Sequence, residues 1–351
     1  GWGQCVGDFD VEEGEHPERV LASIENQCRP WRSSRVNGPE LDHLLSDRHL
    51  DELVTTFRRL TGAQESAACV CVLIDPLLDN PLPILEAIEQ RPRHPLRIKH
   101  DDLALEDAPY LLKVGQEQDH ERLLECSLHQ ALAEQRVAAT TTPAPRAVCA
   151  WILIEEHDLP RLLDALSSLA IVRPPERSAQ RTIFRYWDPR VFEHLPRILG
   201  QQTMQTLLTQ DVTARWLWLD REGQLASQEF KGGQGWRPDV QQWQALSRVE
   251  DLNQCLVLTH SAEKAPSSHD VIRLDKALQH AISLGCRTSI DRMTYALLAD
   301  SLGGSFEHHP LMVDTFRQIA QEQASLSALA EAIPQDTWDR IKIDLSQPHQ
   351  E

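Results

Sequence analysis

Hydrophobic positions in the middle of the chain form short uninterrupted runs that alternate with segments of helical periodicity. The runs are rich in β-forming residues and lack the polar alternation of a strand with one solvated face. They predict strands over 68–75, 108–114, 147–155 and 181–187. Helical spacing follows in 81–90, 119–136 and 157–169, and again from Asp188. This order predicts an α/β (α+β) fold in which a mostly parallel sheet, with some antiparallel edge, is buried between helices.

The pattern changes on both sides of this central region. Before it, apolar residues at helical spacing predict helices over 16–27 and 39–60, behind an acidic start. After it, runs at 214–220 and 224–230 flank a turn at Gly223, which indicates a β-hairpin.

We therefore expect four regions, and no internal repeat is present. They are an acidic start and N-terminal helical extension (1–65), an α/β domain that ends in the hairpin (66–230), an irregular linker (231–270) and a helical C-terminal lobe (271–351).

Composition and charge exclude several classes of partner. The chain has 351 residues, 41% of them hydrophobic, and a formal net charge of −18 at pH 7. A strongly acidic surface repels nucleic acid and anionic lipid, so we expect neither nucleic acid nor a membrane as a partner. No apolar run approaches the roughly 20 residues of a membrane span, and the start lacks the pattern of a secretory signal. These features predict a cytoplasmic protein.

The cysteines agree with a reducing compartment. Eight are spread over the whole chain, and Cys69, Cys71 and Cys149 lie inside apolar runs. A disulfide framework is typical of short secreted chains, so we interpret these residues as buried, reduced thiols.

Motifs of the common enzyme classes are missing. The sequence contains no nucleophile elbow, no phosphate-binding loop and no paired histidines at metalloprotease spacing. The adjacent carboxylates at Asp101–Asp102 and Glu155–Glu156, and the adjacent His308 and His309, fit solvated surface better than a catalytic or metal site. We assign no catalytic, cofactor-binding or metal-binding residue and expect no cofactor.

The segment 184–191, "FRYWDPRV", concentrates aromatic and charged residues. It reads as a corner at which a strand passes into a helix. Asp188 is expected to cap the helix, Pro189 suits its first position, and Pro196 should kink or restart it. Arg185 and Arg190 are not explained by the cap, and we predict that they brace the corner.

Three motifs resemble the effector adaptors, or chaperones (Tap or Tec), of type VI secretion systems. These motifs are "LID" (73–75), "APYLLKV" (108–114) and a strand–helix signature that contains Phe184, Arg185, Tyr186, Asp188, Pro189 and Arg190. The resemblance extends to Trp216, Trp218 and the C-terminal helical segment.

The resemblance implies a non-catalytic adaptor in the cytoplasm of a Gram-negative bacterium. Such a protein binds one cognate toxin effector and helps to load it onto the VgrG spike for use in interbacterial competition. The signature residues are structural with a possible role in partner contact, and Leu311, Met312 and Phe316 are candidates for a partly exposed binding face. Two alternatives stay open: an immunity protein or other regulatory binding module, and an α/β hydrolase-type enzyme.

Overall fold

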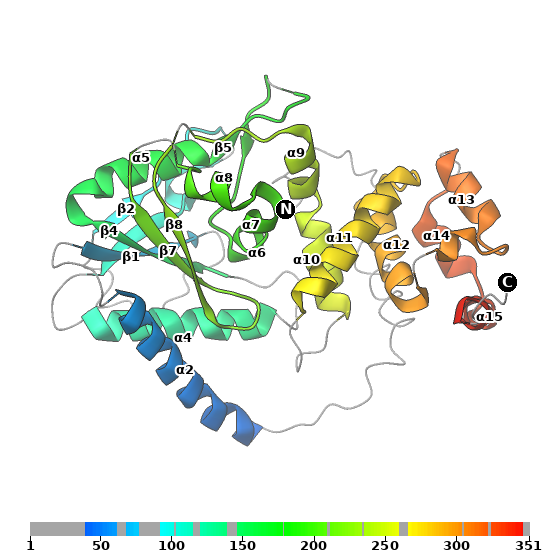
Figure 1. The fold of residues 1–351 in the computed structure, drawn as a ribbon, viewed down its shortest axis with the longest axis horizontal. Helices are drawn as coiled ribbons and strands as arrows, with labels where there is room; N and C mark the ends of the chain where they lie inside the picture. Colours follow the sequence, from blue (N-terminus) through cyan, green and yellow to red (C-terminus); the bar gives the residue numbers. More distant parts are fainter. Residues whose placement is uncertain are drawn as a thin grey trace. The chain divides into compact units, whose positions relative to one another are not determined.

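The computed structural model describes most of the chain from residue 39 to residue 346. The described ranges are 39–61, 68–76, 92–101, 103–114, 120–138, 146–177, 179–208, 211–233, 235–259, 266–303, 305–321 and 324–346. They form two compact units, one ending at Ser247 and the other beginning at Arg248, each with its own hydrophobic clusters (Figure 1). The predicted acidic start and the predicted helices at 16–27 and 81–90 lie outside the described residues.

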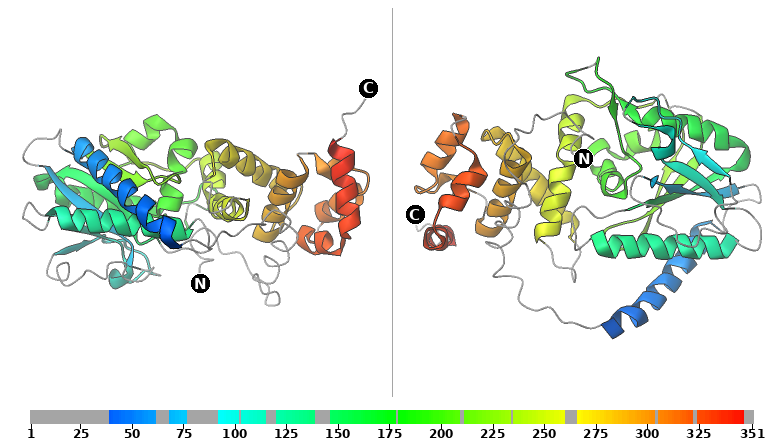
Figure 2. Two further views of the ribbon diagram at one scale, coloured as in Figure 1. Left: turned by 90° about the horizontal axis from the view of Figure 1, so that it is seen from below. Right: turned by 180° about the vertical axis from the view of Figure 1, so that it is seen from behind.

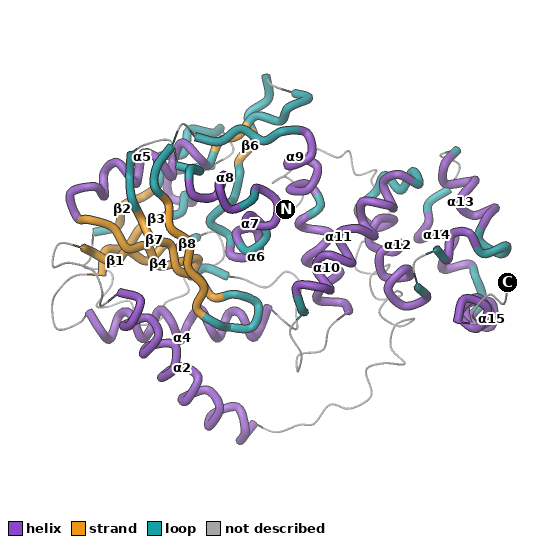
Figure 3. Tube along the Cα trace, viewed as in Figure 1, coloured by secondary structure: helices purple, strands orange, loops and turns teal. Residues whose placement is uncertain are grey.

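A six-stranded sheet in the order β2-β3-β1-β4-β7-β8 organises the first unit (Figure 3). Its strands are β1 Ala68–Ile74, β2 Arg93–Pro95, β3 Tyr110–Val114, β4 Val148–Glu155, β7 Ala214–Leu219 and β8 Leu225–Phe230. All neighbouring pairs are antiparallel. The α+β class is therefore confirmed, but the prediction of a mostly parallel sheet is wrong.

The wrong prediction of strand direction has a physical cause, which is that helices cover both faces of the sheet. Helices pack on both faces of the sheet, so its strands are apolar on both sides, which is the pattern usually seen in parallel sheets. Along β1, Cys71 and Leu73 belong to one hydrophobic cluster, while Val72 and Ile74 belong to the other. Uninterrupted apolar runs thus report burial on both faces, and they carry no information about strand direction.

Two groups of helices supply these layers (Figures 1 and 2). On one face lie α2 Pro39–Thr61 and α4 His120–Ala138, whose buried leucines join the second cluster. On the other lie α5 Leu159–Leu169, α6 Pro189–Phe192, α7 Leu195–Leu199 and α8 Gln201–Gln205. Short 3-10 turns at Leu105–Asp107 and Glu156–Asp158 complete the connections. Asp158 directly precedes α5, but its carboxylate accepts from Arg161 at 3.0 Å and caps no backbone N–H.

The predicted strand at 181–187 is largely wrong. Only β6, Thr182–Ile183, is a strand, and it pairs with β5, Ile171–Val172, in a separate two-stranded sheet. Residues 184–188 form tight turns instead, in which the Asp188 N–H donates to the Arg185 carbonyl at 3.1 Å. Aromatic residues favour strands mainly because strands bury them, and here turns bury the same side chains.

The predicted β-hairpin is confirmed. Asp220 N–H donates to the Gln224 carbonyl at 2.9 Å, and Gly223 N–H donates to the Asp220 carbonyl at 3.1 Å. Gly223 has a φ of 73°, a conformation that glycine adopts without strain. The reading of 231–270 as an irregular linker needs correction, because α9 Val240–Ser247 and α10 Val249–Thr259 occupy its middle. The first of these helices is rich in glutamine and buries only Leu246 fully, so its apolar period is weak.

The second unit is built from helices. After α10 come α11 Ser268–Ser283, α12 Ser289–Leu302, a 3-10 turn at Phe306–His308, α13 Val313–Ala320, α14 Leu326–Ala332 and α15 Gln335–Ser346. Ser267, Thr288 and Ser325 cap α11, α12 and α14 with their hydroxyl groups. Within the described ranges, no helix combines the length and the apolar character needed to cross a membrane.

Candidate functional site

The corner at 184–191 begins with the capped helix that the sequence predicts. Asp188 Oδ1 accepts from the Arg190 backbone N–H at 2.9 Å, and Pro189 is the first residue of α6. The helix ends at Phe192, and α7 begins at Leu195 with Pro196 in its first turn. Both the cap at Asp188 and the restart at Pro196 are therefore confirmed.

Arg190 binds the same carboxylate a second time. Its Nε donates to Asp188 Oδ1 at 3.0 Å and its Nη2 to Oδ2 at 2.7 Å, which is a bidentate pair. Burial alone would raise the pKa of Asp188, but the charges of Arg190 and Arg185 and the hydrogen bonds from Arg190 outweigh it. The pKa of Asp188 consequently lies below its ordinary value, and the carboxylate stays ionised.

Arg185 reaches a different carboxylate, far away in the sequence. Its Nη2 donates to Asp75 Oδ2 at 2.6 Å, and Trp187 Nε1 donates to the same oxygen at 2.8 Å. Asp75 directly follows β1 and is 1% exposed. These contacts join the end of a central strand to the corner, and they give both arginines a buried carboxylate partner. That the two arginines stabilise the corner remains a prediction.

The turn of the β-hairpin extends this network. Arg221 Nε donates to Glu193 Oε1 at 2.7 Å, and its Nη2 lies 2.7 Å from His194 Nε2. Arginine has no acceptor, so this histidine nitrogen accepts and carries no hydrogen. Nearby, burial lowers the pKa of Arg146, and the carboxylates of Glu193 and Asp188 oppose that shift.

The aromatic residues of the signature are core residues. Phe184, Tyr186 and Trp187 are 6%, 0% and 1% exposed. The Tyr186 hydroxyl donates to the Leu166 carbonyl at 2.9 Å, and the rings of Tyr186 and Trp187 meet edge to face at 5.3 Å. A protein partner cannot touch these three rings without unfolding the corner.

Two further titratable groups near the corner, Glu134 and Cys149, are buried and have hydrogen-bond partners inside the protein. Burial raises the pKa of Glu134, yet one of its oxygens accepts from Gln130 and the other from the Val148 backbone. Burial also raises the pKa of the Cys149 thiol, which therefore stays protonated. This arrangement suits a structural role better than nucleophilic or acid–base catalysis.

The cysteines and the two adjacent histidines differ in how they compare with the sequence predictions. The six described cysteines are free thiols, and five of them are buried. His309 is buried and its Nε2 lies 3.2 Å from Asp344 Oδ2, so the prediction that it lies on solvated surface is wrong, whereas His308 is exposed as predicted. Over the described ranges, no group of three or more potential metal ligands converges.

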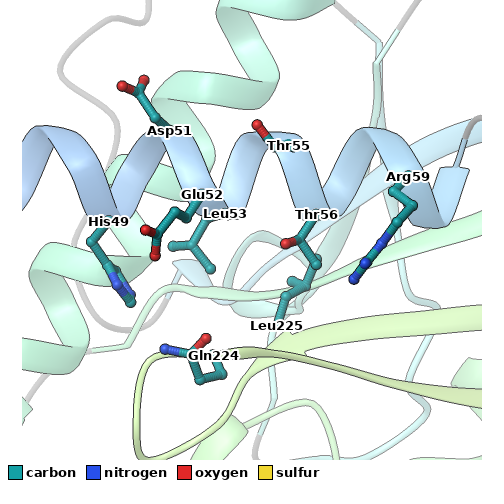
Figure 4. A pocket seen from close by; sticks show the side chains of 9 residues that line it. All are labelled: His49, Asp51, Glu52, Leu53, Thr55, Thr56, Arg59, Gln224 and Leu225. Atoms are coloured by element: carbon teal, nitrogen blue, oxygen red, sulfur yellow. The ribbon is translucent and has the colours of Figure 1, made fainter.

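Two grooves lie outside the charged corner. The first, of about 610 Å³, separates α2 from the start of β8, and Glu52, Thr56 and Arg59 point across it toward Gln224 and Leu225 (Figure 4). The second, of about 650 Å³, lies in the helical unit between α11 and α12. Its lining mixes small apolar residues with cationic and histidine side chains, including Lys276, His269 and His280.

The expected apolar face in the C-terminal segment is mostly core. Met312 is 0% exposed and Phe316 is 8% exposed, and both belong to a hydrophobic cluster. Leu311 is 46% exposed and is the only one of the three that a partner can reach.

Sequence reasoning missed the partners of the corner. Asp75 entered the interpretation only as the last letter of a motif, and no role was predicted for Arg221 or Arg146. One signal was available, because an aspartate directly after a fully apolar strand is buried and needs a cation. Which arginine supplies that cation is decided by the fold.

Comparison with known proteins finds one family-model match, which lies in the first unit. Residues 72–206 match a family model described as "Domain of unknown function (DUF4123)". The match starts within β1 and ends just after α8, so it includes Asp75 and the whole 184–191 corner. The hairpin and the helical unit lie beyond it. No curated protein and no solved structure matches the chain.

Proposed function

Because residues 72–206 belong to the DUF4123 family, known as the type VI secretion effector adaptor (Tap/Tec) domain, we propose that this protein is such an adaptor. It binds a cognate toxin effector in the cytoplasm and helps to load that effector onto the VgrG spike, without catalysing a reaction. The family match is the observation that carries this proposal.

The chemistry of the first unit supports a binding role over an enzymatic one. The groups with clearly shifted pKa values at the corner, Asp188, Glu134 and Cys149, are buried among their own partners and line neither groove. An enzyme needs such groups in contact with its substrate. The groove between α2 and β8 instead offers polar surface to which another protein chain can bind.

Co-expression with the products of neighbouring genes tests the proposal. We expect the tagged protein to purify with the toxin encoded beside it and with the spike protein, and to leave a toxin from an unrelated gene cluster unbound. Deleting the gene should abolish secretion of the cognate toxin and leave secretion of other effectors intact. If the protein binds neither toxin nor spike, the proposal is wrong.

The same experiment separates the adaptor from an immunity protein. An immunity protein neutralises the toxin inside the producing cell and leaves its secretion unchanged. We expect the opposite: loss of this gene should stop secretion of the toxin without making sister cells sensitive to it.

A further inference from the structure

The sheet of the first unit ends in a strand whose outer side is unpaired. Antiparallel neighbours alternate between pairs that exchange hydrogen bonds and pairs that do not. Because Asp220 N–H donates to the Gln224 carbonyl, the exchanging pairs of the register are those of Ala226, Gln228 and Phe230. The backbone N–H and C=O groups of Leu225, Ser227 and Glu229 therefore point away from β7. We call these outward groups the β8 edge.

The β8 edge has almost no partners within the described part of the chain. The Glu229 carbonyl accepts from Gln228 Nε2 at 2.8 Å. The N–H and C=O groups of Leu225 and Ser227, and the N–H of Glu229, contact no other described group. Ser227 is exposed, so water reaches this row. An unpaired row of this kind is a template for another strand.

The opposite edge of the sheet is protected, and β8 is not. The opposite edge strand, β2, has three residues and contains Pro95, which cannot donate a backbone hydrogen bond. By contrast, β8 has six residues, "LASQEF", with no proline or lysine and an unbroken register against β7. Its one charged residue, Glu229, pairs with Arg215 of β7 at 2.9 Å, so this charge is turned toward the sheet.

A wall of polar side chains runs alongside the β8 edge. His49 Nε2 lies 3.0 Å from the Gly223 carbonyl near the hairpin turn, and the Leu60 carbonyl accepts from Arg215, opposite Glu229, at 3.0 Å. Thus α2 follows β8 from one end to the other. Between these contacts lies the groove of about 610 Å³, into which Glu52, Thr56 and Arg59 point (Figure 4).

We propose that the β8 edge binds an extended segment of the effector as a seventh strand, with α2 as one wall of the site. Only a polypeptide backbone presents alternating donors and acceptors at the spacing of this row. The inference rests on the proposed adaptor function and names the part of the partner that is recognised.

The wall predicts the side chains of the bound segment. Arg59 lies in the last turn of α2, next to Leu60, whose carbonyl accepts from Arg215 opposite Glu229. The segment should therefore carry an acidic residue opposite Arg59.

Proline at Ser227 tests the site without breaking the sheet. The Ser227 N–H points outward and donates nothing to β7, so Ser227→Pro blocks the edge while the ladder to β7 is retained. We expect this variant to bind the toxin encoded beside the gene about tenfold or more weakly, as measured by calorimetry; a factor of ten corresponds to about 1.4 kcal/mol. The matched variant Ser227→Ala, which keeps the N–H, should bind within about twofold of the unaltered protein.

Amide hydrogen exchange provides a second readout if Ser227→Pro fails to fold. In the unaltered protein, the amides of Leu225, Ser227 and Glu229 should exchange quickly, and binding of the toxin should slow all three. If the three amides exchange equally fast in the complex, the β8 edge is not the site. The same conclusion follows if folded Ser227→Pro binds the toxin normally, or if it only dissociates a dimer of this chain. If the unaltered protein binds no toxin, the proposed adaptor function is wrong, and the proposed binding site at the β8 edge is wrong as well.

Discussion

The corner of the first unit and the helical second unit both bury charged side chains, but in different structural settings. In the helical unit, the buried Asp251 accepts from Arg292 Nε at 2.7 Å, and Arg248 Nε donates to Asp275 at 3.0 Å. Asp251 lies on α10 and Asp275 on α11, which Ser267 caps, so both carboxylates lie on regular helices. At the corner, Asp75 and Asp188 bind arginines from turns and from a four-residue helix.

This contrast shows that ion pairs stabilise the corner in places where backbone hydrogen bonds of regular secondary structure are absent. Turns at 184–188 bury several backbone and aromatic groups without the hydrogen-bond ladder of a strand, so Arg185 and Trp187 are held through Asp75. In the helical unit, the ion pairs join helices whose backbone hydrogen bonds are made within each helix. Charge removal should therefore cost more at the corner than between the helices.

The largest effect is expected when both corner arginines are replaced. The double variant Arg185→Gln, Arg190→Gln leaves two buried carboxylates without a guanidinium, and breaking a buried pair typically costs about 3–5 kcal/mol. We expect the free energy of unfolding to fall by at least that amount, as measured by urea titration followed by tryptophan fluorescence. If stability is unchanged and effector binding is lost, these arginines bind the partner and do not brace the corner.

Removing one carboxylate of the corner should cost somewhat less. In Asp75→Asn, Arg185 and Trp187 keep a neutral acceptor but lose the charge, and we expect a loss of about 3 kcal/mol. Asp158→Asn is the matched control, because its partner Arg161 is largely exposed and such pairs contribute about 1 kcal/mol or less. Equal losses in the two variants would contradict a special role for the corner.

A carboxylate of the helical unit should show an intermediate effect. Asp291 accepts from the Ser325 hydroxyl at 2.8 Å and from the Ser327 backbone N–H at 2.9 Å, which attaches the start of α14 to α12. We expect Asp291→Ala to lower the free energy of unfolding by about 1–3 kcal/mol. Amide exchange should rise in α14 and stay unchanged at the corner. If Asp291→Ala lowers the free energy of unfolding more than Asp75→Asn does, the corner is not the region where charge removal costs more.

The smallest expected effect is the change with acid pH in the stability difference between the unaltered protein and Asp188→Asn. The folded-state pKa of Asp188 lies below its ordinary value of 3.8, so its ionised form contributes stability that is complete above pH 3.8 and is lost as the pH falls through the folded pKa. The stability difference between the unaltered protein and Asp188→Asn should be constant from about pH 7 to 5 and should shrink below about pH 4. A difference that already declines between pH 7 and 5 would show that another group is responsible.

Much of the local structure could be predicted from the sequence. Helical spacing located α2, α4 and α5, the apolar runs located β1, β3 and β4, and Gly223 marked the hairpin turn. The cap at Asp188 was also predictable, because the capping carboxylate and the N–H that it accepts from are two residues apart. These features depend on residues within a few positions of one another, so they can be identified from the sequence alone.

Contacts across the chain were beyond prediction. Asp75 and Arg185 are 110 positions apart, and many other arginines were equally available to pair with that carboxylate. The free β8 edge, too, depends on which strand ends the sheet, which strand composition does not reveal.

Neighbouring residues in the chain were enough to predict α2, α4, α5, β1, β3, β4, the hairpin turn and the cap at Asp188. Tertiary structure decided that the sheet is antiparallel, that the signature aromatics are core, and that Arg185 and Arg190 face buried carboxylates. The physical reason is common to all three. Periodicity and capping are set by residues within a few positions, whereas strand direction and ion pairing depend on which distant surfaces are buried together.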